Sequence, residues 1–404
     1  MVVWGLGLQF LIAWFLFVIP AGIKFFLFLN AMVTNVLDSA SAGSRFLFGP
    51  LALAPGMVGE NGESSLGFIL AFQVFPTIIF FSAFISILYY VHIIPWIIRQ
   101  FAYLFTKLMR VSGAESLCTA SNVFVGVEST LVIKPFLKEM TRSELCTVLT
   151  AGMATVSSNV LALYVFSLKS VFPNIAGHLV TASLLSAPAA LMMSKILLPE
   201  MESPKTLGEH VDPYIERDHS LFETIIKGAQ AGLQLIGGIA AVLIAILGLV
   251  ALTDHLVGFL GSKINGVWHL TWDWSLKGML GVIFYPFTVI LGIPPADAGI
   301  LAKIIGERAI VTEVVSYQDL AKVMAQGLLQ NPRSAVITTY ALCGFAHVAS
   351  LAIFIGGVSA LAAEKTKMLA QVGFRSLIAA TLACLITACV AGVFFTRGSM
   401  LLGY

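Results

Sequence analysis

Three ionisable side chains lie within apolar stretches of the sequence, where a charged group is energetically unfavourable. Glu128 lies in FVGVESTL, Glu313 in AIVTEVVS and His347 in GFAHVAS, and residues 334–363 around the histidine contain no Asp, Glu, Lys or Arg. Ionisable groups at membrane depth are energetically costly and usually functional. These three residues are therefore the first candidates for binding a polar ligand.

Simpler interpretations stand beside this one. Each glutamate could sit at an aqueous hairpin tip or pair with a cation, Lys134 or Arg308. His347 could be an ordinary buried histidine, but Ser350 follows three residues later, which predicts that both lie on one helical face and contact a ligand. Small polar residues also join membrane helices, an alternative that applies to the cluster Thr155, Ser157, Ser158 and Asn159.

Composition places these residues in a membrane. The 404-residue chain is 58% hydrophobic and 11% charged, with a mean hydropathy of +0.94, whereas soluble domains carry about 25% charged residues. The apolar segments are too long for barrel strands. We therefore expect an all-α polytopic membrane protein. The 23 basic and 21 acidic residues give no sign of a nucleic-acid partner, and the five cysteines, without a CxxC pair, are expected to be buried thiols.

Segments of about 20 apolar residues predict the spans. They cover residues 2–20, 67–92, 144–168, 176–198, 231–253, 335–363 and 373–396. The first lacks a basic flank and is interpreted as a retained span rather than a signal peptide. Residues 21–37 carry Lys24, Asn30 and Asn35 and are expected to form an interfacial helix. Residues 274–293 are apolar but interrupted by Gly281 and Pro286, and the hydrophilic segment 199–227 divides the chain into halves.

Two further segments match each other across these halves. Residues 112–139 and 295–325 are moderately apolar, carry charges near their middle and are each followed by Arg-Ser and a span with polar residues at mid-depth. Interrupted segments at matching positions indicate a transporter with internal repeats, and they point to its binding site. Such backbone breaks are tolerated only where lipid is excluded. The matched placement of Glu128 and Glu313 favours a functional role for both.

At these residues the sequence resembles the concentrative nucleoside transporter family, from about residue 40 to the C-terminus. The run from Asn122 to Glu128 is similar to the family's first-hairpin motif N-x-x-x-G-Q-[ST]-E, and the run from Gly306 to Val314 to its second-hairpin motif G-x-K-x-x-x-N-E-F. Cys343 to Ser350 is similar to C-G-F-A-N-x-x-S. The resemblance implies about seven transmembrane helices plus two re-entrant helical hairpins, interfacial helices and a homotrimer.

The resemblance also implies a division of the chain. The expected parts are a mainly scaffold region 1–111, a first repeat 112–198 with hairpin 1, a connecting loop 199–227, a scaffold span and interfacial helix in 228–294, a second repeat 295–363 with hairpin 2, and a C-terminal span 364–404. The repeats would form a moving transport domain.

Site roles follow from the same resemblance. Glu313, His347 and Ser350 occupy ribose-binding positions, Phe345 a position near the ligand, and Val127, Glu128 and Val160 positions facing the base. A sodium site would use the Asn122 side chain, Thr155, and the carbonyls of Val125 and Val156. Oxygen ligands suit such a hard cation.

The chain also departs from the family pattern. Val127 stands where the first-hairpin motif has polar groups, and one residue of that motif is missing. A glutamine offers a donor and an acceptor to a base edge, whereas a valine offers neither, so base discrimination should differ. His347 replaces an asparagine, Thr312 another asparagine, and Arg308 a lysine.

The sequence therefore predicts sodium-coupled symport of a nucleoside or nucleoside-like solute by an elevator-type mechanism, in the plasma (inner) membrane. Two alternatives remain open: proton-coupled transport of a different small solute using His347, and a non-transporting structural or regulatory membrane protein. An enzyme is not expected, since the sequence has neither HExxH nor GxSxG. Sodium, with the proton as an alternative, is the only cofactor-like species expected.

Overall fold

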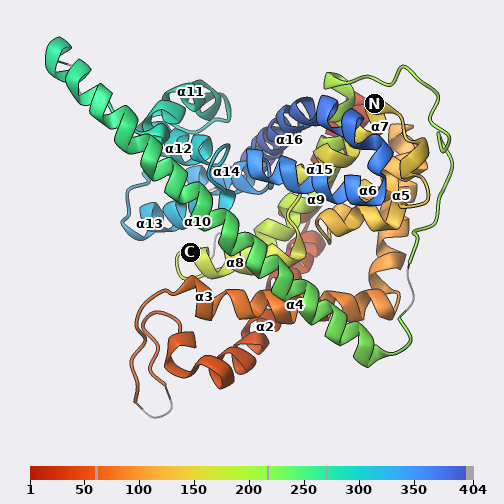
Figure 1. Cartoon of the computed structure of the whole chain (residues 1–404), viewed down its shortest axis with the longest axis horizontal. Helices are drawn as coiled ribbons and strands as arrows, with labels where there is room; N and C mark the ends of the chain where they lie inside the picture. Colours follow the sequence, from red (N-terminus) through yellow and green to blue (C-terminus); the bar gives the residue numbers. More distant parts are fainter. Residues whose placement is uncertain (60–61, 216–217, 270–271, 397–404) are drawn as a thin grey trace.

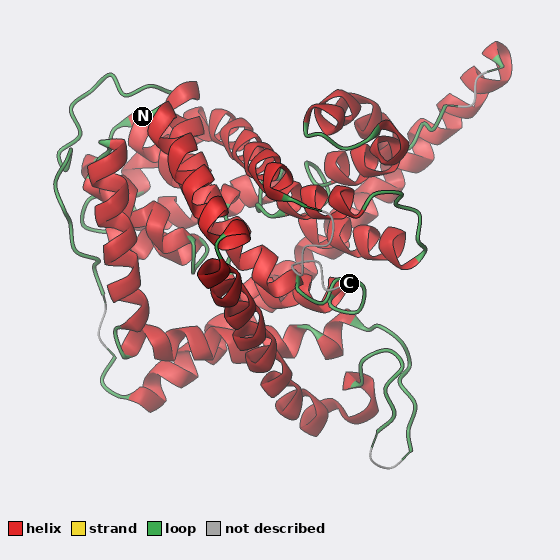
Figure 2. Cartoon of the chain, turned by 180° about the vertical axis from the view of Figure 1, so that it is seen from behind, coloured by secondary structure: helices red, strands yellow, loops and turns green. Residues whose placement is uncertain are grey.

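Helices and their connecting loops build the whole of the described structure. The computed structural model describes residues 1–59, 62–215, 218–269 and 272–396, apart from the side chain of Asn159, and these residues contain no β-sheet (Figure 2). The expected all-α polytopic membrane fold is confirmed. In chain order the helices are α1 (Val2–Val18), α2 (Pro20–Phe48), η1 (Gly49–Ala52), α3 (Leu70–Gln73), α4 (Phe75–Tyr90), α5 (Ile93–Met109), α6 (Gly113–Asn122), η2 (Val127–Ile133), η3 (Leu137–Glu139), α7 (Arg142–Ala154), α8 (Ser158–Leu168), α9 (Ile175–Leu197), α10 (Leu221–Trp268), α11 (Leu276–Ile290), α12 (Pro295–Glu307), α13 (Glu313–Ala325), α14 (Pro332–Leu342), α15 (Val348–Leu361), η4 (Ala363–Lys365) and α16 (Thr366–Phe394).

Among the described residues, five helical segments are long and apolar enough to cross a membrane. They are Pro20–Ala52, Leu70–Tyr90, Ile175–Leu197, Leu221–Trp268 and Ala363–Phe394. The shorter α1, α11 and α15 are apolar too. The expected spans 144–168 and 335–363 are each two helices, α7 with α8 and α14 with α15.

Two local expectations were wrong. Residues 21–37 are not a separate interfacial helix but part of the span-length α2. Asn30 meets protein rather than the membrane surface, because its side chain accepts the Gly177 N–H at 3.0 Å and lies 3.4 Å from the Asn174 side chain. Gly281 and Pro286 do not interrupt α11, which is continuous.

The matched segments fold into matched units. In the first, α6, η2 and η3 precede the broken pair α7–α8; in the second, the hairpin α12–α13 precedes the broken pair α14–α15. Both α6 and α7 begin with capping boxes, in which Ser112 and Thr141 accept the backbone N–H three residues on. Such boxes satisfy backbone donors that a helix start leaves free, so both α6 and α7 of the first unit can begin abruptly inside an apolar body.

The units pack across one another. Helix α13 of the second unit packs on α8 of the first, and η2 of the first packs on α15 of the second, while α16 lies against α7, α9 and α14 (Figure 1). At the second break, a Cβ on Gly344 would lie 2.3 Å from the Cys384 sulfur and 2.8 Å from the Met153 carbonyl oxygen. Only glycine allows the two breaks to approach this closely.

A buried charge network fixes the base of the first hairpin. The Lys195 ammonium group of α9 pairs with Glu115 of α6, donates to the Ser143 hydroxyl at 2.8 Å and lies 3.5 Å from Glu200. Buried charges are tolerated when they are paired and hydrogen-bonded in this way. The network therefore ties α6 and α7 to α9 at a defined place.

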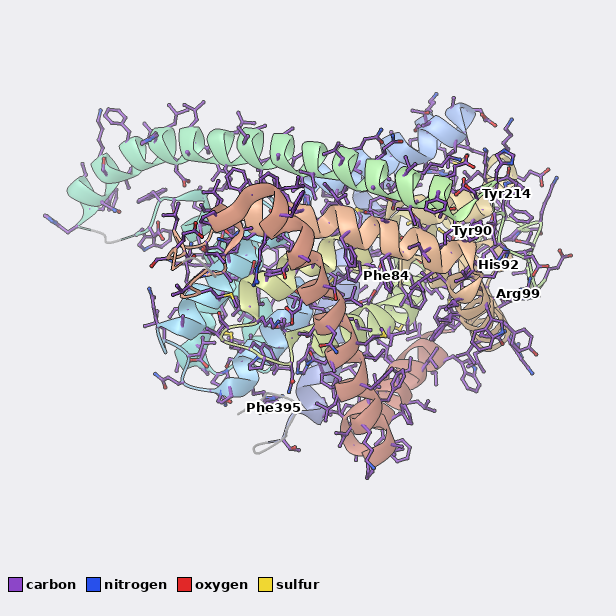
Figure 3. The ribbon with its side chains drawn as sticks, turned by 90° about the horizontal axis from the view of Figure 1, so that it is seen from below. Phe84, Tyr90, His92, Arg99, Tyr214 and Phe395 are labelled. Carbon is purple, nitrogen blue, oxygen red and sulfur yellow. The ribbon has the colours of Figure 1, made fainter. Side chains whose placement is uncertain are left out.

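Helix α10 is the longest element and lies along one side of the molecule. Its 48 residues span roughly 72 Å at 1.5 Å per residue. It crosses the body diagonally past α4, and its C-terminal end projects beyond α11 (Figures 1 and 3). Gly228 and Gly232 let it pack on α4, since a Cβ on either would lie 2.8 Å from the Cα of Ala83 or Ile79. Helix α10 begins at Leu221, so the end of the expected loop 199–227 is helical.

Candidate functional site

The two breaks and the two hairpin tips surround one cavity, here called the inner cavity. Its volume is about 280 Å³. Six of the residues predicted to contact a solute line it, namely Val127, Glu128, Val160, Glu313, Phe345 and His347, and Thr155 and Val156 line it too. Ser350, Asn122 and Val125 are buried but do not line it. The structure thus brings together residues up to 220 positions apart, from Val127 to His347.

Glu313 and His347 form the polar centre of the inner cavity. Both side chains are fully buried, and Nε2 of His347 lies 3.2 Å from Oε2 of Glu313 without hydrogen-bond alignment. Neither atom has a hydrogen-bond partner among the described residues. Buried polar atoms are nearly always hydrogen-bonded. A polar ligand that hydrogen-bonds to this unpartnered pair would therefore gain binding free energy here.

The position of His347 differs from the expectation. It is not on one helical face with Ser350 but precedes α15 as its N-cap. The Ser350 N–H donates to Nδ1 of His347 at 3.2 Å, and the Ser350 hydroxyl accepts the His347 N–H at 3.1 Å. An accepting Nδ1 is unprotonated, so a neutral ring carries its proton on Nε2, facing Glu313. Sequence spacing missed this geometry because the helix break lies at 343–347.

Tyr164, which no sequence motif predicted, completes the environment of Glu313. Its hydroxyl donates to Oε1 of Glu313 at 2.6 Å, so the two oxygens of the carboxylate have different surroundings. Tyr164 lies in α8 four residues after Val160, and residues at this spacing share a helical face. That spacing from a predicted site residue was the available signal.

Arg308, suggested from the sequence as a cationic partner of a glutamate, does not pair with Glu313. Its guanidinium is fully buried and donates to the Ala341 carbonyl at 2.7 Å, at the C-terminal end of α14. A cation at a helix C-terminus is favourable. Tyr164 rather than Arg308 is therefore the hydrogen-bond partner of Glu313. The Lys134 ammonium lies 5.6 Å from the centre of the Tyr214 ring.

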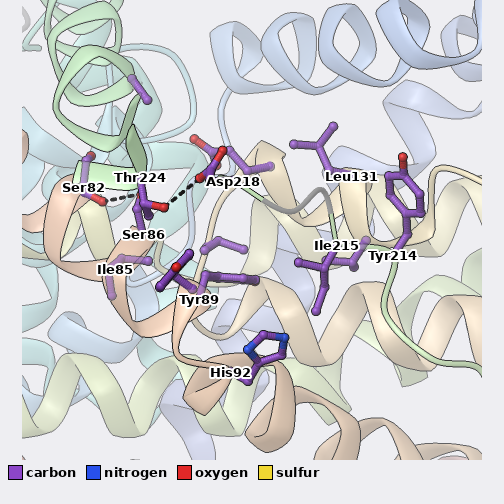
Figure 4. Close-up of a pocket in the computed structure, with 15 residues that line it drawn as sticks. Ser82, Ile85, Ser86, Tyr89, His92, Leu131, Tyr214, Ile215, Asp218 and Thr224 are labelled. Carbon is purple, nitrogen blue, oxygen red and sulfur yellow. Dashed lines mark hydrogen bonds between the residues drawn. The ribbon is translucent and has the colours of Figure 1, made fainter. Parts of the chain in front are cut away.

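Glu128 lies between two spaces. It lines the inner cavity and also a larger outer pocket of about 640 Å³. The outer pocket is bounded by α4, the start of α10 and the segment before it, and Figure 4 shows Tyr89, His92, Tyr214 and Asp218 around it. Val127, the next residue in the chain, packs toward α15, where a Cβ on Gly357 would lie 2.4 Å from its Cγ2. A carboxylate thus marks the boundary between the outer pocket and the inner cavity.

The residues predicted to hold a cation lie where the first hairpin meets the first break. The Oδ1 atom of Asn122 is buried without a hydrogen-bond partner among the described residues, while its amide donates to the Cys118 carbonyl at 3.0 Å. Thr155 caps the end of α7 in an extended conformation. Ser183 of α9, not found from the sequence, donates to the Val123 carbonyl at 3.1 Å and lies 3.4 Å from the Val156 carbonyl. The amide oxygen, hydroxyl and backbone carbonyls of these residues are ligand types that suit a hard cation.

Three further polar side chains line the inner cavity that were not predicted as solute contacts. These are Ser157, Gln234 and Thr312, of which only Gln234 comes from an element, α10, that no motif had connected with the site. The α10 residues that line the inner cavity recur at helical spacing. Residues at this spacing form one stripe along a helix, so a single face of α10 borders the cavity. The sequence had predicted only a membrane span for this part of the chain.

Interrupted helices from two matched units, enclosing a polar cavity inside an apolar body, define a class: membrane transporters built from internal repeats. Three family models match the chain. They describe the Na+ dependent nucleoside transporter C-terminus over residues 178–392, its N-terminus over residues 1–51, and nucleoside recognition over residues 71–171. The chain belongs to this family of sodium-dependent nucleoside transporters, as the motifs predicted, and is an integral plasma-membrane protein rather than an enzyme.

Several relatives support this assignment. The chain is 35% identical to the nucleoside permease NupC of Helicobacter pylori, over 93% of this chain and 87% of the relative. It is 35% identical to solute carrier family 28 member 3 of Mus musculus, over 97% of this chain but only 54% of the relative. The chain thus spans about half the length of the mouse relative. A structure of CNTnw in an inward-facing substrate-bound state matches with a TM-score of 0.86 at 29% identity, covering 97% of this chain and 92% of the other.

Proposed function

We propose that this chain carries a nucleoside or nucleoside-like solute across the membrane together with sodium. The observation that carries the proposal is the unpartnered pair of polar atoms, Oε2 of Glu313 and Nε2 of His347, in the inner cavity. A sugar hydroxyl can donate to the carboxylate and accept from the imidazole, which matches that pair. Relatives described as a sodium/nucleoside cotransporter and a nucleoside permease favour the same solute class.

The cavity offers different surfaces for the two ends of such a solute. Glu313 and His347 would bind the sugar, and Ser350 would hold His347 in place through the capping box rather than contact the solute. The Phe345 ring meets the His347 ring edge-on at 4.6 Å and would form a wall beside the sugar. Val127, Glu128 and Val160 would face the base.

Sodium would bind at Asn122, Val125, Thr155 and Val156. These residues belong to the first hairpin and to the first helix break, so a cation between them would join the two. The same elements supply Glu128, Thr155 and Val160 to the inner cavity. Cation binding would therefore organise one wall of the solute site, which is the physical basis of coupling: two ligands share one conformational state.

The transport step would follow the division of the chain. Residues 112–198 and 295–363 would move as one transport domain, while residues 1–111 and 228–294 would form the scaffold, with elevator-type displacement between them. Helix α10 has few buried residues within one chain, which suits a scaffold helix that faces lipid or other subunits. A homotrimer assembled through such scaffold surfaces is part of this proposal.

Proton coupling is the second candidate, favoured by the 3.2 Å approach of His347 to Glu313. Protonation at Nδ1 would remove the hydrogen bond from the Ser350 N–H. The sodium proposal requires no such change.

Thermal stabilisation of the purified protein tests the function directly. A ligand that binds the folded state raises its stability by mass action. We expect at least one nucleoside to stabilise the protein in sodium and not in potassium, whereas free nucleobases and sugars have less effect. Absence of stabilisation by every nucleoside in both salts would refute the proposal and favour a non-transporting membrane protein.

A further inference from the structure

A single side chain of α10 stands out among the residues of the inner cavity. Of the described lining residues, only Gln234 carries a carboxamide. Among the described lining side chains, it alone offers both an amide donor and a carbonyl acceptor on one plane, the arrangement that pairs with the edge of a heterocyclic base. The first-hairpin tip offers no such group, since Val127 is apolar and Gly126 has no side chain.

The placement of Gln234 follows from the periodicity of α10. The residues of this helix that line the inner cavity are Gln234, Leu235, Gly238, Ile239, Val242 and Leu243. They recur as adjacent pairs every four residues, so they form one stripe along a helix. Gln234 is the first member of that stripe and its only polar one.

Close packing fixes this stretch of α10. Two residues before Gln234, Gly232 lies so near α4 that a Cβ would be 2.8 Å from the Ile79 Cα. One turn after Gln234, a Cβ on Gly238 would meet nothing within 4 Å, so space remains along this lining face of α10. The helix backbone is held while the cavity side stays open. A polar group on a rigid element beside free volume is suited to read a ligand.

We infer that Gln234 reads the hydrogen-bonding edge of the solute's heterocyclic base, supplying from α10 the carboxamide that the first-hairpin tip lacks. This inference rests on the proposed function and deepens it. The sugar end is held by Glu313 and His347, which come from the second unit, so the base end projects toward the first unit and α10. Because α10 belongs to the proposed scaffold, this contact exists only while the repeats and the scaffold have their present relative position.

If Gln234 reads the base, the selectivity among nucleosides with different bases depends on it, whereas the affinity for the sugar does not. Uridine, cytidine and adenosine present a donor–acceptor edge, whereas benzimidazole riboside keeps the sugar and an aromatic ring without that edge. A site built to pair with polar groups rejects an analogue that lacks them. The wild-type protein should therefore prefer at least one of the natural nucleosides over benzimidazole riboside, by about tenfold or more.

The experiment compares two glutamines of the same helix. Gln234→Leu should erase the preference for natural nucleosides over benzimidazole riboside, measured by competition for sodium-dependent uptake into proteoliposomes. Gln230→Leu is the matched control, since Gln230 lies one turn earlier and lines neither the inner cavity nor the outer pocket. It should keep the preference. Gln234→Glu, which loses the donor but keeps an acceptor, should change the order among the three nucleosides.

The outcomes separate the inference from the function on which it rests. A Gln234→Leu protein that binds nucleosides with the wild-type preference overturns the inference and leaves the proposed function standing. If the wild-type protein binds no nucleoside at all, the proposed function fails first. If Gln234→Leu does not fold, the selectivity of Gln234→Glu decides, and an unchanged order among the nucleosides then overturns the inference.

Discussion

His347, in the break between α14 and α15, faces Glu313 at the start of α13, with Nε2 3.2 Å from Oε2. The remaining atoms of each side chain are engaged elsewhere: Nδ1 of His347 caps α15, and Oε1 of Glu313 accepts the Tyr164 hydroxyl. The protein's own hydrogen bonds thus orient both groups and leave one atom of each toward the inner cavity. Because both side chains are already ordered, less conformational entropy is lost when a ligand binds to them.

Replacing Glu313 by glutamine keeps the shape of the side chain and removes its charge. Removing one charge from a buried polar site costs about 2–5 kcal/mol of binding. We expect Glu313→Gln to weaken sodium-dependent nucleoside binding at least about 30-fold, while the melting temperature without ligand changes little. Isothermal titration and thermal unfolding measure the two quantities. A variant with altered stability but wild-type affinity would indicate a purely structural role.

Tyr164→Phe removes the 2.6 Å hydrogen bond to Glu313 and keeps the ring. Hydrogen bonds to charged groups contribute about 1.5–3 kcal/mol, so affinity for the nucleoside should fall about 10- to 150-fold. Tyr317→Phe is the control, because Tyr317 packs 4.7 Å from Tyr164 but donates to the Thr339 carbonyl instead. The control should lose stability and keep its affinity. Equal affinity losses in both variants would contradict the role assigned to Tyr164.

Asn122→Ala tests the cation site through the unpartnered Oδ1 atom. The loss of one oxygen ligand should raise the sodium concentration for half-maximal nucleoside binding by about tenfold, equivalent to about 1.4 kcal/mol. Ser116→Ala, on the same helix and also buried, serves as the control. Affinity at saturating sodium should be nearly unchanged in Asn122→Ala. A sodium dependence identical to that of wild type would place the cation elsewhere.

The protonation of His347 is tested by pH. Because Nδ1 already accepts a backbone N–H, we expect sodium-driven uptake to be independent of pH between about 5.5 and 8, the interval in which an imidazole ordinarily titrates. Uptake is measured with and without sodium at each pH. Uptake that rises steeply as the pH falls, in the absence of sodium, would favour the proton-coupled alternative.

Packing beside the cavity is tested at a glycine. A Cβ on Gly152 would lie 2.2 Å from the Phe354 ring, and overpacking of this kind costs about 1–3 kcal/mol. Gly152→Ala should therefore lower the melting temperature. Gly237→Ala meets no atom within 4 Å and should be neutral or stabilising, since alanine favours helix. A Gly152→Ala protein as stable as Gly237→Ala would show that Phe354 can move aside.

Periodicity and charge placement predicted much of the architecture. The apolar segment 176–198 corresponds closely to α9, and 373–396 to the greater part of α16, because a lipid-exposed or buried helix is apolar over most of its length. The matched polar interruptions located the two hairpin segments, whereas the two broken helix pairs α7–α8 and α14–α15 were expected as single spans. Asn30 made residues 21–37 look like an interfacial helix, since a polar side chain satisfied by a neighbouring helix looks the same in sequence as one that meets water.

By itself the sequence determined the fold class, the two matched segments, the family and several of the residues that line the inner cavity, because each of these rests on local composition or on motifs contiguous in the chain. Only the tertiary structure decided how those residues meet. It paired His347 with Ser350 as a helix cap, gave Glu313 its Tyr164 partner, placed Arg308 at the end of α14 and brought Gln234 of α10 to the inner cavity. These contacts join residues far apart in the chain or lie where a helix stops, and no local periodicity encodes them.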